Sequence, residues 1–93
     1  MNKIKLVFDK SLSNLAGYEF GIKIYNDQVK DKINLEEPFV FEFPEQIKVV
    51  ASSFVQGFFA DIVNQIGLLA TEERARIESV NVRLVNSLLQ KLQ

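Results

Sequence analysis

Cysteine and histidine are both absent from this sequence of 93 residues. Without cysteine, the chain has no disulfides, no thiol chemistry and no thiolate-bound zinc or iron–sulfur cluster. Without histidine, it lacks the commonest general base, the commonest metal ligand and any histidine-based catalytic triad. We therefore expect a protein that is not an enzyme and that carries no metal and no cofactor.

A marked excess of charge of either sign is also missing, because 11 basic residues stand against 12 acidic ones. Nucleic-acid-binding domains usually show a basic excess, so we expect no nucleic-acid partner. No run approaches the roughly 20 apolar residues of a membrane span. Met1-Asn2-Lys3 leads into an expected strand rather than a signal peptide. The sequence thus predicts a cytoplasmic protein that makes no membrane contact.

The chain does contain enough apolar material for one core. Hydrophobic residues make up 47% of the sequence, and 8 of them are phenylalanine. A chain of this length buries about 60–65% of the surface that its unfolded form exposes, which allows a single modest core. We expect one domain spanning residues 1–93.

Alternating apolar residues predict strands over residues 3–8, 39–43 and 76–80. The middle strand carries three phenylalanines on one face. Such a row could stack nucleic-acid bases if basic residues lay beside it. Its neighbours include Val40 and Glu42 instead, so core packing is the better interpretation.

Three helices are expected between and after these strands. The first covers residues 21–33 and follows a small, polar connection at 11–17, although residues 18–25 also alternate like a strand and that alternative stays open. In the second, Ser53 and Gln56 have the spacing of a capping box. Its expected terminator is the left-handed Gly67, with Leu68 folding back. The third is capped by Asn81, and its apolar stripe is Val82, Val85, Leu88, Leu89 and Leu92.

The resulting order is β-α-β-α-β-α. Strands that alternate with helices are typical of an α/β fold in which helices pack on a sheet. The sequence therefore predicts a single small α/β sandwich with a mostly parallel or mixed sheet.

Residues 39–67 carry the resemblance to a known family. An apolar strand, a short apolar approach and the pair Ser52-Ser53 opening a helix resemble the STAS-like family of small bacterial domains. That family is related to the STAS domains of anti-sigma-factor antagonists, in which the serine corresponding to Ser53 is phosphorylated. Antagonists have aspartate at the position of Ala51 and a small residue at that of Phe54, so the Ser-Ser-Phe form looks like the STAS-like branch.

The resemblance implies a non-enzymatic protein–protein interaction module in bacterial signalling or regulation. It also implies that the start of the second helix binds the partner, and that this partner is an ATPase regulator of the histidine-kinase type. The site residues that we expect are Ser52, Ser53, Phe54, Val55, Gly57 and Phe58. Gly57 is included because its bare surface permits close approach. We expect Phe54→Ala or Ser53→Glu to weaken partner binding while the domain stays folded.

Two other functions stay open. The apolar residues of the second helix cover roughly half of its circumference, which is more than a core-facing stripe needs. Phe54, Phe59 and Val63, near the edges, are either an exposed patch that pairs two copies in a homodimer or residues covered by neighbouring helices. The free amides at the same helix N-terminus could instead bind a small ligand or a nucleotide.

Ser53 itself has several interpretations. It is a plain helix cap worth about 1 kcal/mol, a cap within a partner interface, or a phosphosite that gains about 1.5–2 negative charges. Lys48 is the one nearby base for a Ser–Lys pair. Asp61 and the pair Glu72-Glu73 are expected to be solvated charges.

Overall fold

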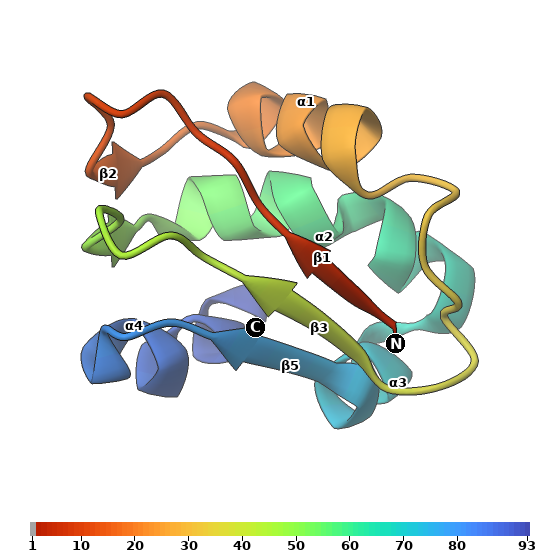
Figure 1. Ribbon diagram of the computed structural model, residues 1–93. Coiled ribbons are helices and arrows are strands. Elements are labelled where there is room, and N and C mark those ends of the chain that lie inside the picture. The colour runs from red at the N-terminus through yellow and green to blue at the C-terminus, as the bar shows by residue number, and fades with distance from the viewer. Residues whose placement is uncertain (1) are drawn as a thin grey trace.

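The computed structural model describes residues 2–93 and confirms the α/β class. Its main sheet has three parallel strands in the order β1-β3-β5, so that β3 lies in the centre (Figure 1). These strands are β1 (Lys3–Lys5), β3 (Phe39–Glu42) and β5 (Ala75–Glu78). Ile4, Phe41 and Ile77 form one row across the sheet and pack into or against the hydrophobic core.

A second, two-stranded parallel sheet pairs β2 (Asn14–Leu15) with β4 (Val49–Val50). The expected connection at 11–17 therefore contains a strand, which is too short for alternation to reveal. Each of these strands leads into a helix, β2 into α1 (Tyr18–Gln28) and β4 into α2 (Ser52–Ile66). Their pairing brings the starts of α1 and α2 to the same end of the molecule (Figure 1).

The helical interpretation of α1 is confirmed, and the strand alternative over residues 18–25 is wrong. The helix begins three residues earlier than expected and ends five residues before Ile33. It ends because the Lys30 N–H donates to the Tyr25 carbonyl, five residues back, and Asp31 then adopts a positive φ of 65°. Ile33 lies beyond the helix and packs against the core from there.

Gly67 ends α2 with a φ of 86°, in the region that favours glycine, as expected. Leu68 does not fold back, however, but begins the helix α3 (Leu68–Arg74). The sequence pattern does not predict this helix, because a short and largely polar segment shows no apolar period. The buried Thr71 hydroxyl donates to the Gly67 carbonyl over 2.7 Å. This bond joins the first turn of α3 to the residue that precedes the helix.

The last helical segments are α4 (Val82–Ser87) and the 3₁₀ helix η1 (Leu89–Leu92). Asn81 caps α4 as expected, since its side-chain oxygen accepts from the Leu84 N–H over 3.4 Å. The expected apolar stripe is confirmed at the buried Leu88 but is wrong in part, because Val82 is 66% exposed and Leu84, outside the stripe, is buried. The change from α to 3₁₀ geometry alters the period, so one helical stripe does not continue along the whole segment.

Phenylalanine rings fill the core between the sheet and α2. Phe39, Phe41 and Phe43 are all buried, which confirms that this row packs in the core. Phe41 meets Phe58 of α2 edge to face, with ring centroids 4.9 Å apart. This is one of the geometries that aromatic pairs prefer.

Two buried glycines let α1 and α2 pack at very short range. A Cβ atom on Gly57 would overlap the backbone of Tyr18 at the start of α1. A Cβ on Gly21 would overlap the backbone of α2 at Phe54 and Phe58. The two helices are therefore in contact through their backbones.

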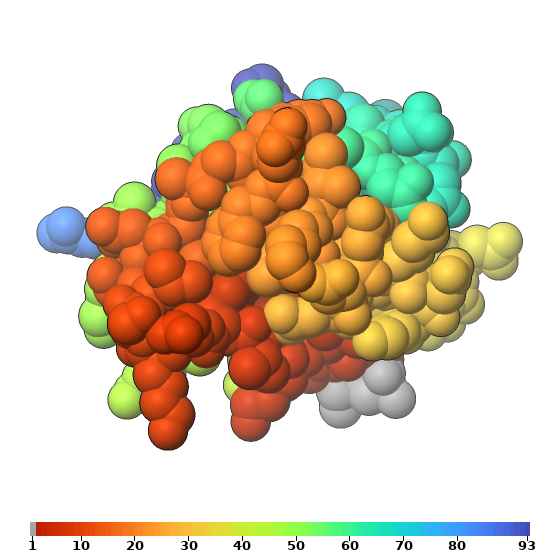
Figure 2. Space-filling view, turned by 90° about the horizontal axis from the view of Figure 1, so that it is seen from above, coloured from red at the N-terminus to blue at the C-terminus, as the bar shows by residue number. Residues whose placement is uncertain are grey.

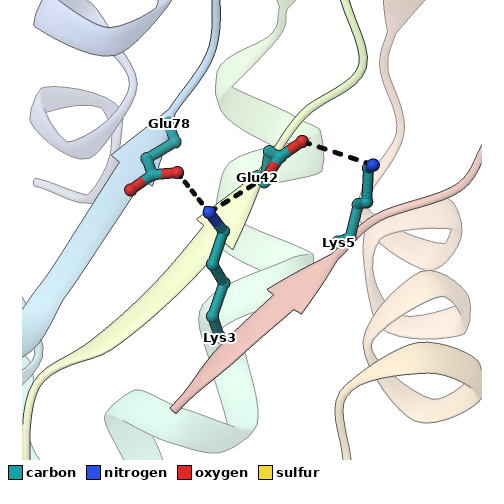
Figure 3. Close-up of polar contacts among 4 residues, drawn as sticks. All are labelled: Lys3, Lys5, Glu42 and Glu78. Carbon is teal, nitrogen blue, oxygen red and sulfur yellow. Dashed lines mark hydrogen bonds and ion pairs between the residues drawn. The ribbon is translucent and has the colours of Figure 1, made fainter. Parts of the chain in front are cut away.

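The opposite face of the main sheet carries charged side chains (Figure 3). The Lys3 ammonium lies 2.6 Å from a Glu78 carboxylate oxygen and 3.1 Å from one of Glu42, so it bridges β1 to both other strands. Lys5 adds a longer contact to Glu42. The hydrogen bonds to Glu78 and then to Glu42 raise the pKa of Lys3. Figure 1 views this face, with α2 behind the strands.

Within residues 2–93, no helix combines the length and the apolar character that crossing a bilayer requires.

Candidate functional site

The starts of α1 and α2 are joined by two hydrogen bonds between segments far apart in the sequence. The Ala51 N–H donates to the Leu15 carbonyl over 2.8 Å, which extends the β2–β4 pairing up to the helix. The Gly17 N–H donates to the Ser53 hydroxyl oxygen over 2.9 Å. Ser53 thereby fixes the first residues of α2 against the residue that precedes α1.

The prediction of a capping box at Ser53 is wrong. Ala51 is the N-cap residue, and α2 already begins at Ser52, without a hydrogen bond from any side chain at the cap. The Ser53 hydroxyl accepts from Gly17 instead of from a first-turn amide. The spacing of Ser53 and Gln56 is a local pattern and carries no signal for a donor 36 residues away.

The six predicted site residues fall into two groups. Ser52 and Ser53 are exposed at the start of α2. The other four, Phe54, Val55, Gly57 and Phe58, are buried. The first group can contact a partner directly, whereas the second can act only by shaping the helix and its packing.

The bare surface of Gly57 is occupied within the chain itself. The close approach that we expected from a partner is made by the backbone of Tyr18. Of the two alternatives for the helix edges, the exposed patch is wrong for Phe54 and Phe59, because both are buried in the core. Of the three residues proposed for that patch, only Val63 keeps partial exposure. Phe54 packs against Phe8 and against Phe20 of α1, and Phe59 packs against Phe41 of β3.

A shallow groove runs along the part of α2 that stays uncovered, and we call it the α2 groove. Its volume is about 310 Å³, and it is lined by Tyr18, Gln56, Ala60, Val63, Leu68 and Leu92. Tyr18 is 49% exposed and follows Gly17, whose N–H donates to the Ser53 hydroxyl. The groove contains no charged side chain. Figure 2 looks down onto α1, in orange, which adjoins green residues from the region of the α2 start.

Asp61 is more than a solvated charge. Its carboxylate accepts from the Tyr25 hydroxyl over 2.8 Å and from the Gln65 side chain over 2.8 Å. Burial, and then the hydrogen bond to Asp61, raise the pKa of Tyr25 well above its ordinary value of 10. The pair links α1 to α2 at the edge of a cavity of about 280 Å³.

Removing this link tests its contribution. We expect Tyr25→Phe to lower the free energy of unfolding by about 1 kcal/mol at pH 7. The folded-state pKa of Tyr25 exceeds the unfolded one, so its contribution is complete below about pH 10 and is lost as the pH rises towards the folded pKa. Urea unfolding of the natural chain should therefore give a lower free energy of unfolding above pH 10 than at pH 7. This decline should be smaller in Tyr25→Phe.

The matched control is Tyr18→Phe, which removes the hydroxyl of an exposed tyrosine. It should keep the alkaline decline of the natural protein. An equal decline in both variants would show that the Tyr25–Asp61 bond does not cause it.

Two further polar side chains, those of Lys48 and Arg74, bind backbone carbonyls of the chain. The Lys48 ammonium donates to the Glu45 carbonyl over 3.1 Å, and no hydrogen bond joins Lys48 to Ser53 in the described part of the chain. Arg74 donates to the Leu35 carbonyl over 2.8 Å. Among residues 2–93, no three His, Cys, Asp or Glu side chains gather in a way that could hold a metal ion.

Comparisons of the chain with protein-family models, with curated proteins and with solved structures found no significant match.

Proposed function

We propose that this chain is a non-enzymatic protein–protein interaction module of the STAS-like type, which works in bacterial signalling or regulation in the cytoplasm. The observation that carries the proposal is the surface where α1 and α2 begin. There, the exposed Ser52 and Ser53 stand at one end of the α2 groove, and Ser53 is hydrogen-bonded to Gly17.

The chemistry of this surface suits a protein better than a nucleotide. The α2 groove is lined by apolar side chains, one tyrosine and one glutamine. Tyrosine is enriched at protein interfaces because it has a large apolar body and a polar tip. A nucleotide would require charge compensation for its phosphates, and no cation lines the groove. The resemblance to the STAS-like family implies that this protein partner is an ATPase regulator of the histidine-kinase type.

Ser53 is the residue at which this surface could be switched. A glutamate at this position loses the hydroxyl that accepts from Gly17 and adds a negative charge beside the groove. Negative charge is tolerated at a helix N-terminus, so the domain should stay folded. A partner that fits the unmodified surface would be repelled or displaced.

The experiment compares three baits in native lysate: the natural chain, Ser53→Glu and the control Asn26→Glu, which changes an exposed residue of α1 that no described hydrogen bond engages through its side chain. Direct affinity for any captured protein is then measured with purified components. We expect an ATPase regulator that binds the natural chain and Asn26→Glu, and that binds Ser53→Glu at least tenfold more weakly. Equal affinity for all three baits would remove Ser53 from the interface.

The homodimer is the second candidate, and the exposed apolar residues Tyr18 and Leu68 beside the α2 groove are the observation in its favour. Sedimentation equilibrium distinguishes the two. Self-association in the micromolar range or tighter, lost in Leu68→Glu, would favour the homodimer. A strict monomer at high concentration would exclude it.

A further inference from the structure

A second groove lies between β4 and α4, at the end of the molecule towards which the main strands point (Figure 1). Ligands of parallel α/β sheets commonly bind outside the carboxyl ends of the strands. The groove has a volume of about 400 Å³, and the lining residues that matter here are Lys48, Val49, Asn81, Arg83, Ser87 and Lys91. We call it the cationic groove.

Its charge is entirely of one sign. Lys48, Arg83 and Lys91 line it, and no aspartate or glutamate does. None of the three takes part in an ion pair within residues 2–93. In a chain whose net charge is −1, three cations without a carboxylate among them are a local concentration of positive charge. Such a patch attracts anionic groups.

The cations keep free donors for a ligand. Lys91 donates to the Val50 carbonyl over 2.5 Å, and Lys48 donates to the Glu45 carbonyl. Each ammonium has three donors, so two remain available on each. Arg83 is exposed, and its guanidinium donates to no protein acceptor in the described chain. The hydrogen bonds of Lys91 and Lys48 hold their ammonium groups near β4 without neutralising them.

Exposed valines accompany these charges. Val49, in the wall of the groove, is 53% exposed, and Val82, beside Arg83, is 66% exposed. A bare phosphate would use only the cations. A peptide that alternates acidic and apolar side chains would use the cations and the valines together.

The groove also lies close to the start of α2 along the chain. Val50, to which Lys91 is bonded, is separated from Ser52 by the single residue Ala51. A peptide bound to the groove would therefore reach the exposed serines. This geometry connects the groove to the interface proposed above.

We propose that the cationic groove binds an acidic, partly apolar segment of the protein partner. This inference rests on the proposed function and names the chemistry of the partner. In this proposal, Lys48, Arg83 and Lys91 attract the acidic groups of the partner. Negative charge at Ser53 switches binding off.

The test is an NMR titration of the labelled natural chain with a synthetic peptide rich in glutamate and leucine. Parallel titrations use the same peptide with glutamine in place of glutamate, and inorganic phosphate. We expect amide shifts confined to residues 48–50 and 81–91, with the acidic peptide only. The double variant Lys48→Gln, Arg83→Gln should bind it roughly tenfold more weakly, since each exposed charge pair contributes up to about 1 kcal/mol. The double variant Lys30→Gln, Lys32→Gln removes the same two charges at exposed lysines outside the groove and should not change the affinity.

Several results would overturn the inference. These are equal binding of the glutamine peptide, equal weakening by the control Lys30→Gln, Lys32→Gln, or groove shifts with phosphate and none with the acidic peptide. The two proposals fail separately. Partner capture that depends on Ser53 but survives the double groove variant would refute the groove alone, whereas peptide binding in the groove with capture indifferent to Ser53→Glu would refute the switch alone.

Discussion

Gly57→Ala is expected to lower the free energy of unfolding by about 3 kcal/mol or more. Glycine-to-alanine changes inside helices usually stabilise by roughly 0.5–1 kcal/mol, because alanine restricts the unfolded chain and favours the helix. Gly57 lies in the interior of α2, so helix propensity alone predicts a gain. The expected sign is opposite because of what faces this residue.

The facing atoms are backbone and cannot move aside cheaply. A Cβ on Gly57 would lie 2.8 Å from the Tyr18 carbonyl carbon and nearer still to its oxygen. Tyr18 is the first residue of α1 and follows Gly17, which Ser53 holds by a hydrogen bond. Relieving the overlap requires α1 to shift away from α2. Overpacking of a tight core costs about 1–3 kcal/mol even where side chains can adjust.

Chemical unfolding monitored by circular dichroism measures this effect. The control is Asn64→Ala, which introduces alanine at an exposed position of the same helix and should be neutral or slightly stabilising. Gly21→Ala should behave like Gly57→Ala, because its Cβ meets the backbone of α2. A Gly57→Ala protein as stable as Asn64→Ala would show that the two helices do not pack as described.

The main elements could be predicted from the sequence because their signals are local and repeated. Three phenylalanines at alternate positions predict β3, and their burial follows from the same pattern. The strands β2 and β4 have two residues each, so neither contains a full repeat. The segment α3 shows no apolar period at all. These elements depend on tertiary contacts rather than on local preference.

The candidate site was predictable in position but not in chemistry. The pair Ser52-Ser53 does begin the second helix, although the N-cap residue is Ala51, two residues before the expected Ser53. The hydrogen-bond donor to Ser53 is Gly17, and nothing in the spacing of Ser53 and Gln56 could identify a residue from another segment. The width of the apolar surface on α2 was apparent, but which neighbours cover it depends on how α1 and η1 are placed. For the same reason, Gly57 had no visible partner in the sequence.

Phe54→Ala is expected to destabilise the domain by about 3–5 kcal/mol, the usual cost of deleting a buried phenylalanine ring. The side chain is 1% exposed, so the earlier expectation that this variant stays folded and loses only partner contact is revised. Its ring contacts three others, from three parts of the chain. The centroid of Phe54 lies 6.3 Å from that of Phe8, 5.6 Å from that of Phe20 and 5.8 Å from that of Phe58.

Removing this ring leaves a cavity where α1, α2 and the segment after β1 meet. A domain of this size has a free energy of unfolding of only about 5–15 kcal/mol, so a large fraction of the variant would be unfolded at the upper end of the expected loss. Urea denaturation of Phe54→Ala and of Phe54→Leu, which keeps most of the apolar volume, should rank them in that order of instability. An equal stability of Phe54→Ala and the natural chain would place the ring outside the core.

The stability of the Phe54 variants determines how their loss of partner binding is interpreted. A Phe54→Ala bait that captures no partner would report loss of the folded surface and not loss of a contact, because its neighbour Ser53 needs an ordered α2 to accept from Gly17. Ser53→Ala provides the discriminating comparison, since it removes that one bond at an exposed position and should cost only about 1 kcal/mol. Partner binding that is weakened in Ser53→Ala, at a temperature where the variant is fully folded, assigns the effect to the surface itself. Binding that falls only in proportion to the unfolded fraction, in both variants, assigns it to stability.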